Sequence, residues 1–300
     1  MCIKNLKFNN IKLNTPKLSN IILDNSIIKS INLSDLPIKF IHLVNNAQMN
    51  IEDCSQLCKL RLTDSSITDL RKLNKMTQLT DLSINNCTIN ENSLPLLPSL
   101  TNLEINDTKI TSIANILEKC PNLTKLSILN ASIKDINLLK PHTNLKDLFL
   151  NFNEIKTLEG INDMLPNLQI LDLEENQLRN LKGIPKNLQH ICACKNNLTD
   201  ISHIKDCKYM HKLCIYNNKI KSIEALKYLQ NLFYLVISNN EITSLEGLEQ
   251  CKNLKYLSIN GNNITSIKPV KDLNMSSLFI SKDHNIKDLN LINSKIIKYK

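Results

Sequence analysis

Apolar side chains recur along this chain in one fixed pattern. The segments that begin at Leu168, Leu232 and Leu254 each follow the order L-x-x-L-x-L-x-x-N-x-L. Apolar residues at the fourth and sixth positions predict a short strand with one buried face, because successive side chains of a strand point to opposite sides. The template recurs along the whole chain, with most starts 19 to 23 residues apart. The sequence therefore predicts a stack of coils, each made of one strand and one return segment.

This template is that of the leucine-rich repeat, and the chain resembles that family over essentially its whole length. The resemblance implies an α/β fold, a leucine-rich repeat solenoid or horseshoe, with a parallel concave β-sheet and mostly 3₁₀ or extended convex segments. We expect a single domain over 1–300, with a short cap-like repeat over 1–17, the main repeats over 18–274 and a degenerate C-terminal cap over 275–300. The template begins near Ile3, Leu18, Ile38, Leu57, Leu79, Leu100, Leu123, Leu145, Leu168, Leu188, Met210, Leu232, Leu254 and Met275.

Asparagine is abundant, with 44 residues, and glycine is scarce, with 4. An amide at the ninth position can bond to backbone groups of adjacent coils, which predicts a ladder of asparagines. The later coils all carry this amide: Asn153, Asn176, Asn196, Asn218, Asn240 and Asn262. The earlier coils replace it by Ser26, Ser65, Cys87, Thr108 and Ala131. Gly160, Gly183 and Gly247 each lie 15 residues after a repeat start and predict turns. So few glycines argue against the phosphate-binding loop of an enzyme.

Charge is spread unevenly over a chain whose formal net charge is +9. Residues 201–300 hold 15 basic and 8 acidic side chains, a net charge of +7. This basic third makes binding to nucleic acid or to an anionic surface one candidate function. Its lysines are interspersed with acids, so a solvated repeat surface is the simpler interpretation. The first residues lack the apolar core of a signal peptide, and no apolar stretch approaches the ~20 residues of a membrane span. We expect a cytoplasmic protein, with the nucleus as the alternative.

The ten cysteines fall at repeat positions rather than in metal-binding pairs. Four of them lie three residues before a repeat start, which predicts buried thiols: Cys54, Cys120, Cys207 and Cys251. Cys192, Cys194 and Cys214 are weak candidates for metal ligands, because all three fall on the concave side of adjacent coils. A flat sheet face presents ligands side by side rather than around a point. We therefore expect no metal and no cofactor.

Aromatic residues are concentrated at the positions that face the concave side. Eight of the twelve lie there: Phe40, Phe149, Phe152, Tyr216, Phe233, Tyr234, Tyr256 and Phe279. An acidic patch lies among them, formed by Asp147, Asp172, Glu174 and Glu175. Exposed aromatic side chains are enriched at protein interfaces, which predicts a protein-binding surface away from the convex face. Ring contacts between neighbouring strands are the alternative explanation.

Three short motifs refine the family resemblance: LEGI at 158–161, ITSLEGL at 242–248 and CKNL at 251–254. They look like the repeats of the regulatory subunits of type 1 protein phosphatase, and also like those of bacterial internalins. The resemblance implies that the concave face docks a partner. The matching residues are Phe149, Phe152, Asp172, Glu174, Tyr216, Phe233, Tyr234 and Tyr256.

The function predicted by these features is a non-enzymatic scaffold that binds another protein. A regulatory subunit of a type 1 serine/threonine phosphatase is a sharper version of it, which would make a phosphatase catalytic subunit the partner. Binding of nucleic acid or an anionic surface is the third reading. An enzyme is not expected, because the six histidines are spread over five coils, and only His190 and His211 share a face.

Overall fold

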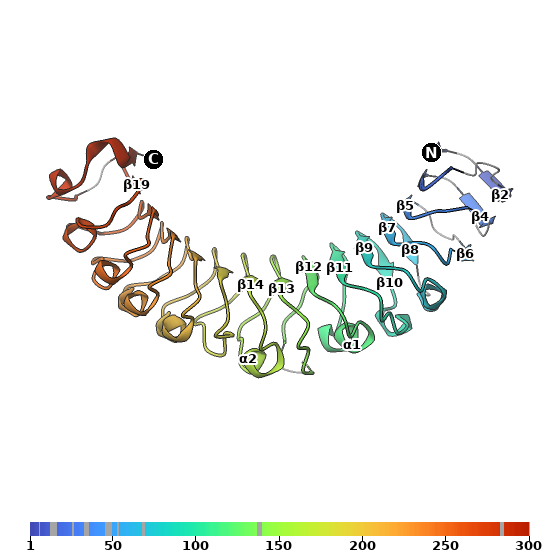
Figure 1. Ribbon diagram of the computed structural model, residues 1–300, viewed down its shortest axis with the longest axis horizontal. Helices are drawn as coiled ribbons and strands as arrows, with labels where there is room; N and C mark the ends of the chain where they lie inside the picture. Colours follow the sequence, from blue (N-terminus) through green and yellow to red (C-terminus); the bar gives the residue numbers. More distant parts are fainter. Residues whose placement is uncertain are drawn as a thin grey trace. The chain divides into compact units, whose positions relative to one another are not determined.

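A computed structural model describes residues 1–300 except 6, 13–16, 26, 33–35, 46–49, 53, 68–69, 137–139, 283–284 and 300. It divides into two compact units, which we call the first unit (Met1–Ile133) and the second unit (Lys134–Lys300). In each unit the strands lie side by side along one edge of the coils, and the helical turns lie along the other (Figure 1). No helix of the described residues is long and apolar enough to cross a membrane.

The first unit contains a parallel sheet whose strands follow chain order. Its strands are β1 (Cys2–Lys4), β3 (Asn20–Asp24), β5 (Phe40–Val44), β7 (Lys59–Thr63), β9 (Asp81–Asn85), β11 (Asn102–Asn106) and β12 (Lys125–Leu129). The fourth and sixth positions of each coil point inward, as at Leu82 and Ile84, which are each 1% exposed. Because the fourth residue of one strand pairs with the fourth of the next, the apolar side chains form continuous inward rows.

The return segments of the first unit are more regular than the sequence predicts. Several form strands that pair in two further parallel sheets: β2 (Lys7–Lys12), β4 (Ile27–Asn32) and β6 (Asn50–Glu52), then β8 (Ser66–Ile67) and β10 (Thr88–Ile89). The remaining regular segments are η1 (Arg71–Lys75), η2 (Glu91–Ser93) and α1 (Ile113–Lys119). The template could not distinguish paired from unpaired extended chain, because strand pairing depends on the neighbouring coil.

The second unit repeats the same construction with shorter strands. They are β13 (Asp147–Phe149), β14 (Ile170–Asp172), β15 (His190–Cys192), β16 (Lys212–Cys214), β17 (Tyr234–Val236), β18 (Tyr256–Ser258), β19 (Ser277–Ile280) and β20 (Ile297–Tyr299). Most return segments contain a helical turn: α2 (Ile161–Met164), η3 (Ser202–Asp206), η4 (Glu224–Tyr228), η5 (Leu248–Gln250), η6 (Lys268–Val270), η7 (Leu289–Leu291) and η8 (Ser294–Ile296). The prediction of a parallel-sheet solenoid with mostly 3₁₀ or extended return segments is confirmed. Whether 1–300 acts as one domain stays a prediction.

The start assigned to the first repeat is wrong. The structure pairs Ile3 with Leu23, a sixth-position residue, so Ile3 also holds the sixth position and not the first. The spacing from Ile3 to Leu23 therefore equals that from Leu23 to Leu43, and the 15-residue spacing predicted for the first repeat is wrong. Whether 1–17 acts as a cap stays a prediction. At the other end, β20 pairs with β19 and adds one further coil after Met275.

The asparagine ladder forms in the second unit as predicted. In a typical rung, Asn196 Nδ2 donates to the carbonyl oxygens of Leu173 and Cys194 at 2.9 and 3.0 Å, and its Oδ1 accepts from Leu178 N at 2.9 Å. In the first unit Thr108 takes over part of this role, because its hydroxyl accepts from Cys87 N at 3.0 Å. Ser26 lies outside the described residues.

Ala131 occupies the ninth position of its coil, where the ladder of the second unit has an asparagine. Asn130 and Ser132, which flank it, both have positive φ angles, of 51° and 61°. Among the described residues other than glycine, every other residue with a positive φ holds the eighth position of its coil, whereas Ser132 holds the tenth. The backbone thus departs from the regular coil where the ladder position carries a side chain without a polar group.

A second ladder of side-chain hydrogen bonds, which the repeat template does not predict, runs along the eighth position of the coils. Every coil from Asn5 to Gly261 places this residue in the left-handed region, where asparagine and aspartate are tolerated better than other side chains. The side chains bond from coil to coil, as in Asn86 to Asp64 at 2.6 Å and Asn239 to Asn217 at 2.7 Å. The many Asn and Asp residues at this position were a visible signal in the sequence, and they account for part of the asparagine excess.

Replacing Gly183 by Ala should lower the free energy of unfolding by about 1–3 kcal/mol. Gly183 has φ +90°, and an added Cβ would overlap the backbone carbonyl of Leu158 in the preceding coil. Gly160 is the matched control, because it has φ +86° but nothing within 4 Å of an added Cβ. Urea denaturation of both variants would measure the difference. Equal losses would show that the steric contact at Gly183 contributes nothing.

Candidate functional site

The solvent side of the strands in the second unit forms a continuous surface, which we call the sheet face. It consists of positions two, three, five, seven and eight of each coil. Register places Phe149 beside Asp172, and Tyr234 beside Tyr256. All eight residues of the predicted partner-binding set lie on this face, in or beside two clusters of different charge.

The first cluster lies where the strands end, and we call it the acidic cluster: Asp172, Glu174, Glu175, Lys195 and Tyr216. Tyr216 Oη donates to Glu174 Oε1 at 2.8 Å, although the two residues are 42 positions apart. Lys195 Nζ lies 2.9 Å from Glu174 Oε1 and 2.8 Å from Glu175 Oε1. Three carboxylates and one ammonium leave two negative charges in the cluster.

Hydrogen bonding fixes the protonation states in the acidic cluster. Partial burial would raise the pKa of Glu174, but the hydrogen bonds from Lys195 and Tyr216 outweigh it and lower that pKa below its usual value. The pKa of Lys195 is raised by its bonds to Glu175 and Glu174. Burial, and then the bond to Glu174, raise the pKa of Tyr216. These shifts favour an ionised Glu174 carboxylate, a charged Lys195 ammonium and a neutral Tyr216 hydroxyl at neutral pH.

Phe152 stands next to the acidic cluster in an unusual backbone conformation. It occupies the eighth position of its coil with φ 59°, and its side chain is 46% exposed. The next two coils also lack asparagine or aspartate there and carry Glu175 and Lys195 at φ 55° and 53°. A bulky side chain in the left-handed region costs about 1–2 kcal/mol. The eighth positions of these three consecutive coils are therefore locally destabilising, and they lie together at one place on the sheet face.

The second cluster lies where the strands begin, and it is built around stacked rings. Tyr234 and Tyr256 stack with centroids 4.2 Å apart and planes 11° apart, and Phe279 follows at 4.9 Å from Tyr256. Lys212 Nζ lies 5.2 Å from the centroid of the Tyr234 ring. The ring contacts between neighbouring strands that the alternative explanation invokes are present at these residues. Burial and the hydrogen bond to Tyr256 raise the pKa of Tyr234 to about 12.

A groove of 530 Å³ opens beside the stacked rings, and we call it the aromatic groove. It is lined by His190, His211, Lys212, Asn231, Phe233, Tyr234, Asn253 and Lys255. Phe233 is 52% exposed, so its ring is not explained by packing against a neighbour. Burial, together with the charges of Lys212 and His211, lowers the pKa of His190 and keeps it largely neutral at pH 7. The lining contains two lysines and no acid, which gives the groove the opposite sign to the acidic cluster.

Six of the ten cysteines are buried thiols, whereas the candidate ligands Cys192 and Cys214 are partly exposed. Cys194 has no exposed surface, so the expectation that it is presented on the concave face is wrong; its Sγ lies 3.5 Å from Cys192 Sγ. Among the described residues, no group of three or more His, Cys, Asp or Glu side chains could hold a metal ion. The predicted filler thiols Cys54, Cys120, Cys207 and Cys251 are all buried, which confirms that prediction. Burial raises the pKa of Cys207 and Cys251 to about 12.

Some exposed rings lie elsewhere, which corrects the prediction that aromatics avoid the convex side. Tyr228 lies in η4 on the return side and is 44% exposed, with Lys208 Nζ 4.9 Å from its ring centroid. Phe40 belongs to the first unit, where its ring lies 6.4 Å from that of His42. The predicted site omitted three lysines that the structure places in the clusters or the groove: Lys195, Lys212 and Lys255. The sequence could not show which lysines lie near the rings or carboxylates of a neighbouring coil.

Comparisons with known proteins agree with the fold. The family model described as leucine-rich repeats (two copies) matches residues 143–186, 186–228 and 230–275. The part of the chain between residues 143 and 275 is built of leucine-rich repeats. These three matches all fall within the second unit, and the leucine-rich repeat register of the first unit is seen in its strand pairing and inward rows.

Similar proteins come from several sources. The acidic leucine-rich nuclear phosphoprotein 32 family member A of Drosophila melanogaster is 32% identical over 133 residues, which cover 42% of this chain and 47% of that protein. The chain thus spans about half the length of this leucine-rich repeat relative. The crystal structure of an internalin, inlF, of Listeria monocytogenes superposes with a TM-score of 0.74 at 23% identity, covering 89% of this chain and 80% of that one. A leucine-rich repeat protein of Leptospira interrogans gives a TM-score of 0.69 at 20% identity, covering 94% and 90%. These two structures share the fold.

Proposed function

We propose that this protein is a non-enzymatic scaffold that binds a partner protein through the sheet face of the second unit. The observation that carries the proposal is Phe152, a half-exposed phenylalanine in a left-handed conformation that most other coils reserve for asparagine or aspartate. Strained residues persist at functional sites, where the local cost is offset by what the side chain does. The leucine-rich repeat fold, which serves protein interaction generally, supports the same conclusion.

The two clusters define the chemistry of the partner. The acidic cluster with Phe149 and Phe152 suits a segment that presents basic and apolar side chains. The aromatic groove, with Phe233 exposed and lysines around it, suits an apolar side chain flanked by an acid. A partner that contacts both clusters must carry these features in a fixed order, so the pair provides specificity as well as affinity.

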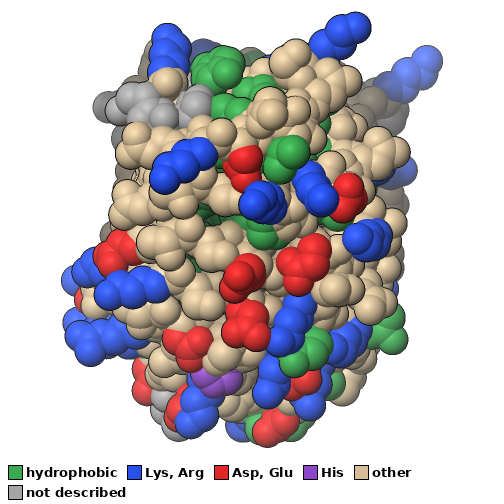
Figure 2. Space-filling view, turned by 90° about the vertical axis from the view of Figure 1, so that its left-hand side faces the viewer, with side chains coloured by type: hydrophobic (Ala, Val, Ile, Leu, Met, Phe, Trp, Pro, Cys, Tyr) green, Lys and Arg blue, Asp and Glu red, His purple; other side chains and the backbone are tan. Residues whose placement is uncertain are grey.

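Two other functions predict different partners. A regulatory role toward a type 1 phosphatase predicts direct binding of that catalytic subunit at the same residues. Nucleic acid or an anionic surface would use the basic C-terminal third. On the face shown in Figure 2, seen from the C-terminal side, basic and acidic side chains are interspersed rather than gathered in one basic patch. This mixture favours a protein partner. We propose a cytoplasmic or nuclear location, and the nuclear phosphoprotein relative supports the second.

The proposal can be tested by affinity capture from the source cell, followed by mass spectrometry. Partners that bind the wild-type protein should be lost from the double variant Phe233→Ala with Tyr234→Ala, whereas the folding of the variant should be intact. A Tyr228→Ala variant on the return side is the control and should retain them. Unchanged partners in the double variant would contradict the sheet-face site. Binding that weakens steeply with salt and follows the lysines of 201–300 would favour nucleic acid instead.

Replacing Phe152 by Asn should raise the free energy of unfolding by about 1 kcal/mol and weaken the partner complex. Asparagine tolerates the left-handed conformation, and it removes the exposed ring. Phe152→Leu is the control, because it removes the ring but keeps a side chain that disfavours this conformation. Urea denaturation and binding to the captured partner would measure both effects. A Phe152→Asn protein that is less stable than wild type would show that the ring packs to stabilise its own coil.

A further inference from the structure

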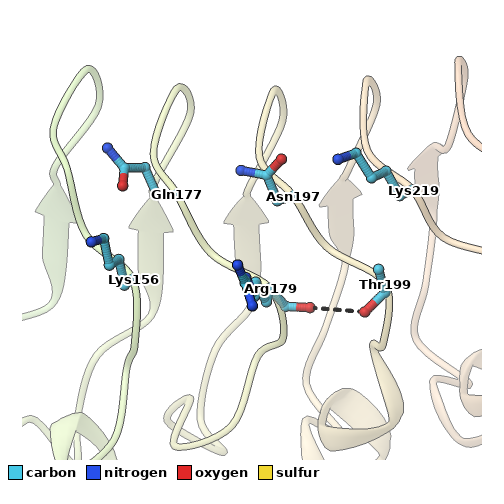
Figure 3. A pocket seen from close by; sticks show the side chains of 6 residues that line it. All are labelled: Lys156, Gln177, Arg179, Asn197, Thr199 and Lys219. Carbon is cyan, nitrogen blue, oxygen red and sulfur yellow. Dashed lines mark hydrogen bonds between the residues drawn. The ribbon is translucent and has the colours of Figure 1, made fainter.

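A second groove, which we call the flank groove, lies beside the sheet face where four successive coils leave their strands. It has a volume of 610 Å³ and is lined by Lys156, Gln177, Arg179, Asn197, Thr199 and Lys219. All six side chains are exposed. They come from the tenth and twelfth positions of the coils that begin at Leu145, Leu168, Leu188 and Met210, and they form two adjacent rows (Figure 3).

The flank groove concentrates positive charge that has no neutralising partner nearby. Its lining contains three cations and no acid. In the same two rows outside the groove, the acids are already paired, Glu154 with Lys134 at 3.5 Å and Glu241 with Lys221 at 3.7 Å. Within the part of the chain that the structure describes, no ion pair is found for Lys156, Arg179 or Lys219. An incoming anion would therefore compete with no carboxylate for these cations.

The groove has a rigid backbone frame. Gln177 N bonds to Ile155 O at 2.9 Å, Asn197 N to Leu178 O at 2.9 Å, and Thr199 N to Arg179 O at 3.0 Å. Thr199 Oγ1 also donates to the Arg179 carbonyl at 3.4 Å, the contact drawn in Figure 3. Because the backbone is held from coil to coil, the protein itself loses only side-chain freedom when a ligand binds.

We propose that the flank groove binds an extended acidic peptide. Four coils at ~4.8 Å spacing span about 14 Å, which matches four to five residues of extended chain at ~3.3 Å each. Gln177 and Asn197 each offer a donor and an acceptor, as a peptide backbone requires. Arg179 can hold a carboxylate or a phosphate through two parallel hydrogen bonds. No aromatic ring lines the groove, so nucleic acid bases would find no surface on which to stack.

This site is independent of the proposed sheet-face function, because it uses none of the residues of either cluster. Its ligand carries side-chain carboxylates or phosphates at alternate positions, which an extended chain places about 7 Å apart on one side. Carboxylates and phosphates can each pair with the three cations of the groove. The two sources differ in charge per residue, and a binding experiment separates them.

Fluorescence anisotropy with labelled eight-residue peptides tests the proposal on the full chain at low salt. The probes alternate Ser with Glu, phosphoserine or Gln and have blocked ends; an eight-nucleotide oligothymidine is the fourth probe. The Glu peptide, the phosphoserine peptide or both should bind, and the Gln peptide should not. Arg179→Gln should weaken binding about ten-fold, the loss expected for a hydrogen bond between charged groups. Lys221→Gln, in the same row but already paired with Glu241, should leave it unchanged.

Tighter binding of the phosphoserine peptide would support phosphorylated segments as the source, and equal or tighter binding of the Glu peptide would support carboxylate-rich ones. Failure of both to bind, or an unchanged affinity in Arg179→Gln, would overturn the proposal. Tighter binding of the oligothymidine would overturn the choice of a peptide. Because all six lining side chains are exposed, the thermal unfolding midpoints of the variants should equal that of the wild-type protein, which separates lost binding from lost folding.

Discussion

Replacing Leu235 by Ala is expected to lower the free energy of unfolding by about 2–5 kcal/mol. Leu235 holds the fourth position of its coil, is 0% exposed, and pairs with Leu213 and Leu257 in the strands on either side. Truncation leaves a cavity inside a continuous row, and the neighbouring coils cannot close it without breaking their own register. The loss should therefore be near the upper part of that range.

Urea denaturation followed by far-ultraviolet circular dichroism would measure the loss. Val236→Ala is the matched control, because Val236 is the next residue on the same strand but faces solvent and is only half-buried. Its variant should lose clearly less stability. A Leu235→Ala protein as stable as Val236→Ala would mean that the inward row does not hold the coils together.

Asn196→Ala is the second large expected effect, a loss of about 2–4 kcal/mol. The substitution removes a hydrogen bond from each of three backbone groups: Leu178 N, Leu173 O and Cys194 O. Leu173 O keeps its bond from Asn176 Nδ2 and Cys194 O its bond from Glu175 N, so Leu178 N is the group left without a partner. Asn196 is buried, so water cannot readily replace the amide, and each buried polar group without a partner costs about 1–3 kcal/mol. Two of the three groups belong to the preceding coil, so the contact between coils should weaken as well.

Asn197→Ala is the control for this variant, because it makes the same chemical change one residue further along at an exposed position. It should change the unfolding free energy by less than about 0.5 kcal/mol. Hydrogen exchange of the Leu178 amide would report the broken rung directly, with faster exchange in Asn196→Ala alone. Similar stability losses in the two variants would contradict a structural role for the ladder.

Features confined to one coil were predictable from the sequence. The inward Leu and Ile rows, the ninth-position amides and the turn glycines each depend on one short segment, and the structure confirms them. The left-handed eighth position is equally local, and its Asn and Asp residues could have revealed it. The phase of the first coil was missed because Ile3 fits two positions of the template, and only its pairing with Leu23 decides between them.

Features that depend on which coil lies beside which were not predictable. The sequence placed aromatic and acidic residues on one face but did not show that they separate into an acidic cluster and an aromatic groove. The hydrogen bond from Tyr216 to Glu174 joins residues two coils apart, and it exists because register brings these side chains within reach. The flank groove has the same origin, since its cations come from three different coils.

The sequence by itself determined a leucine-rich repeat solenoid, because the buried residues of such a fold recur at the same positions in every coil. Only the tertiary structure decided which charges are neutralised and which remain open. Lys221 has Glu241 beside it, whereas Lys156, Arg179 and Lys219 line a groove with no acid. The physical reason is that an ion pair needs two side chains within a few ångströms of each other. In this fold such neighbours lie on adjacent coils and are therefore about 20 residues apart along the chain.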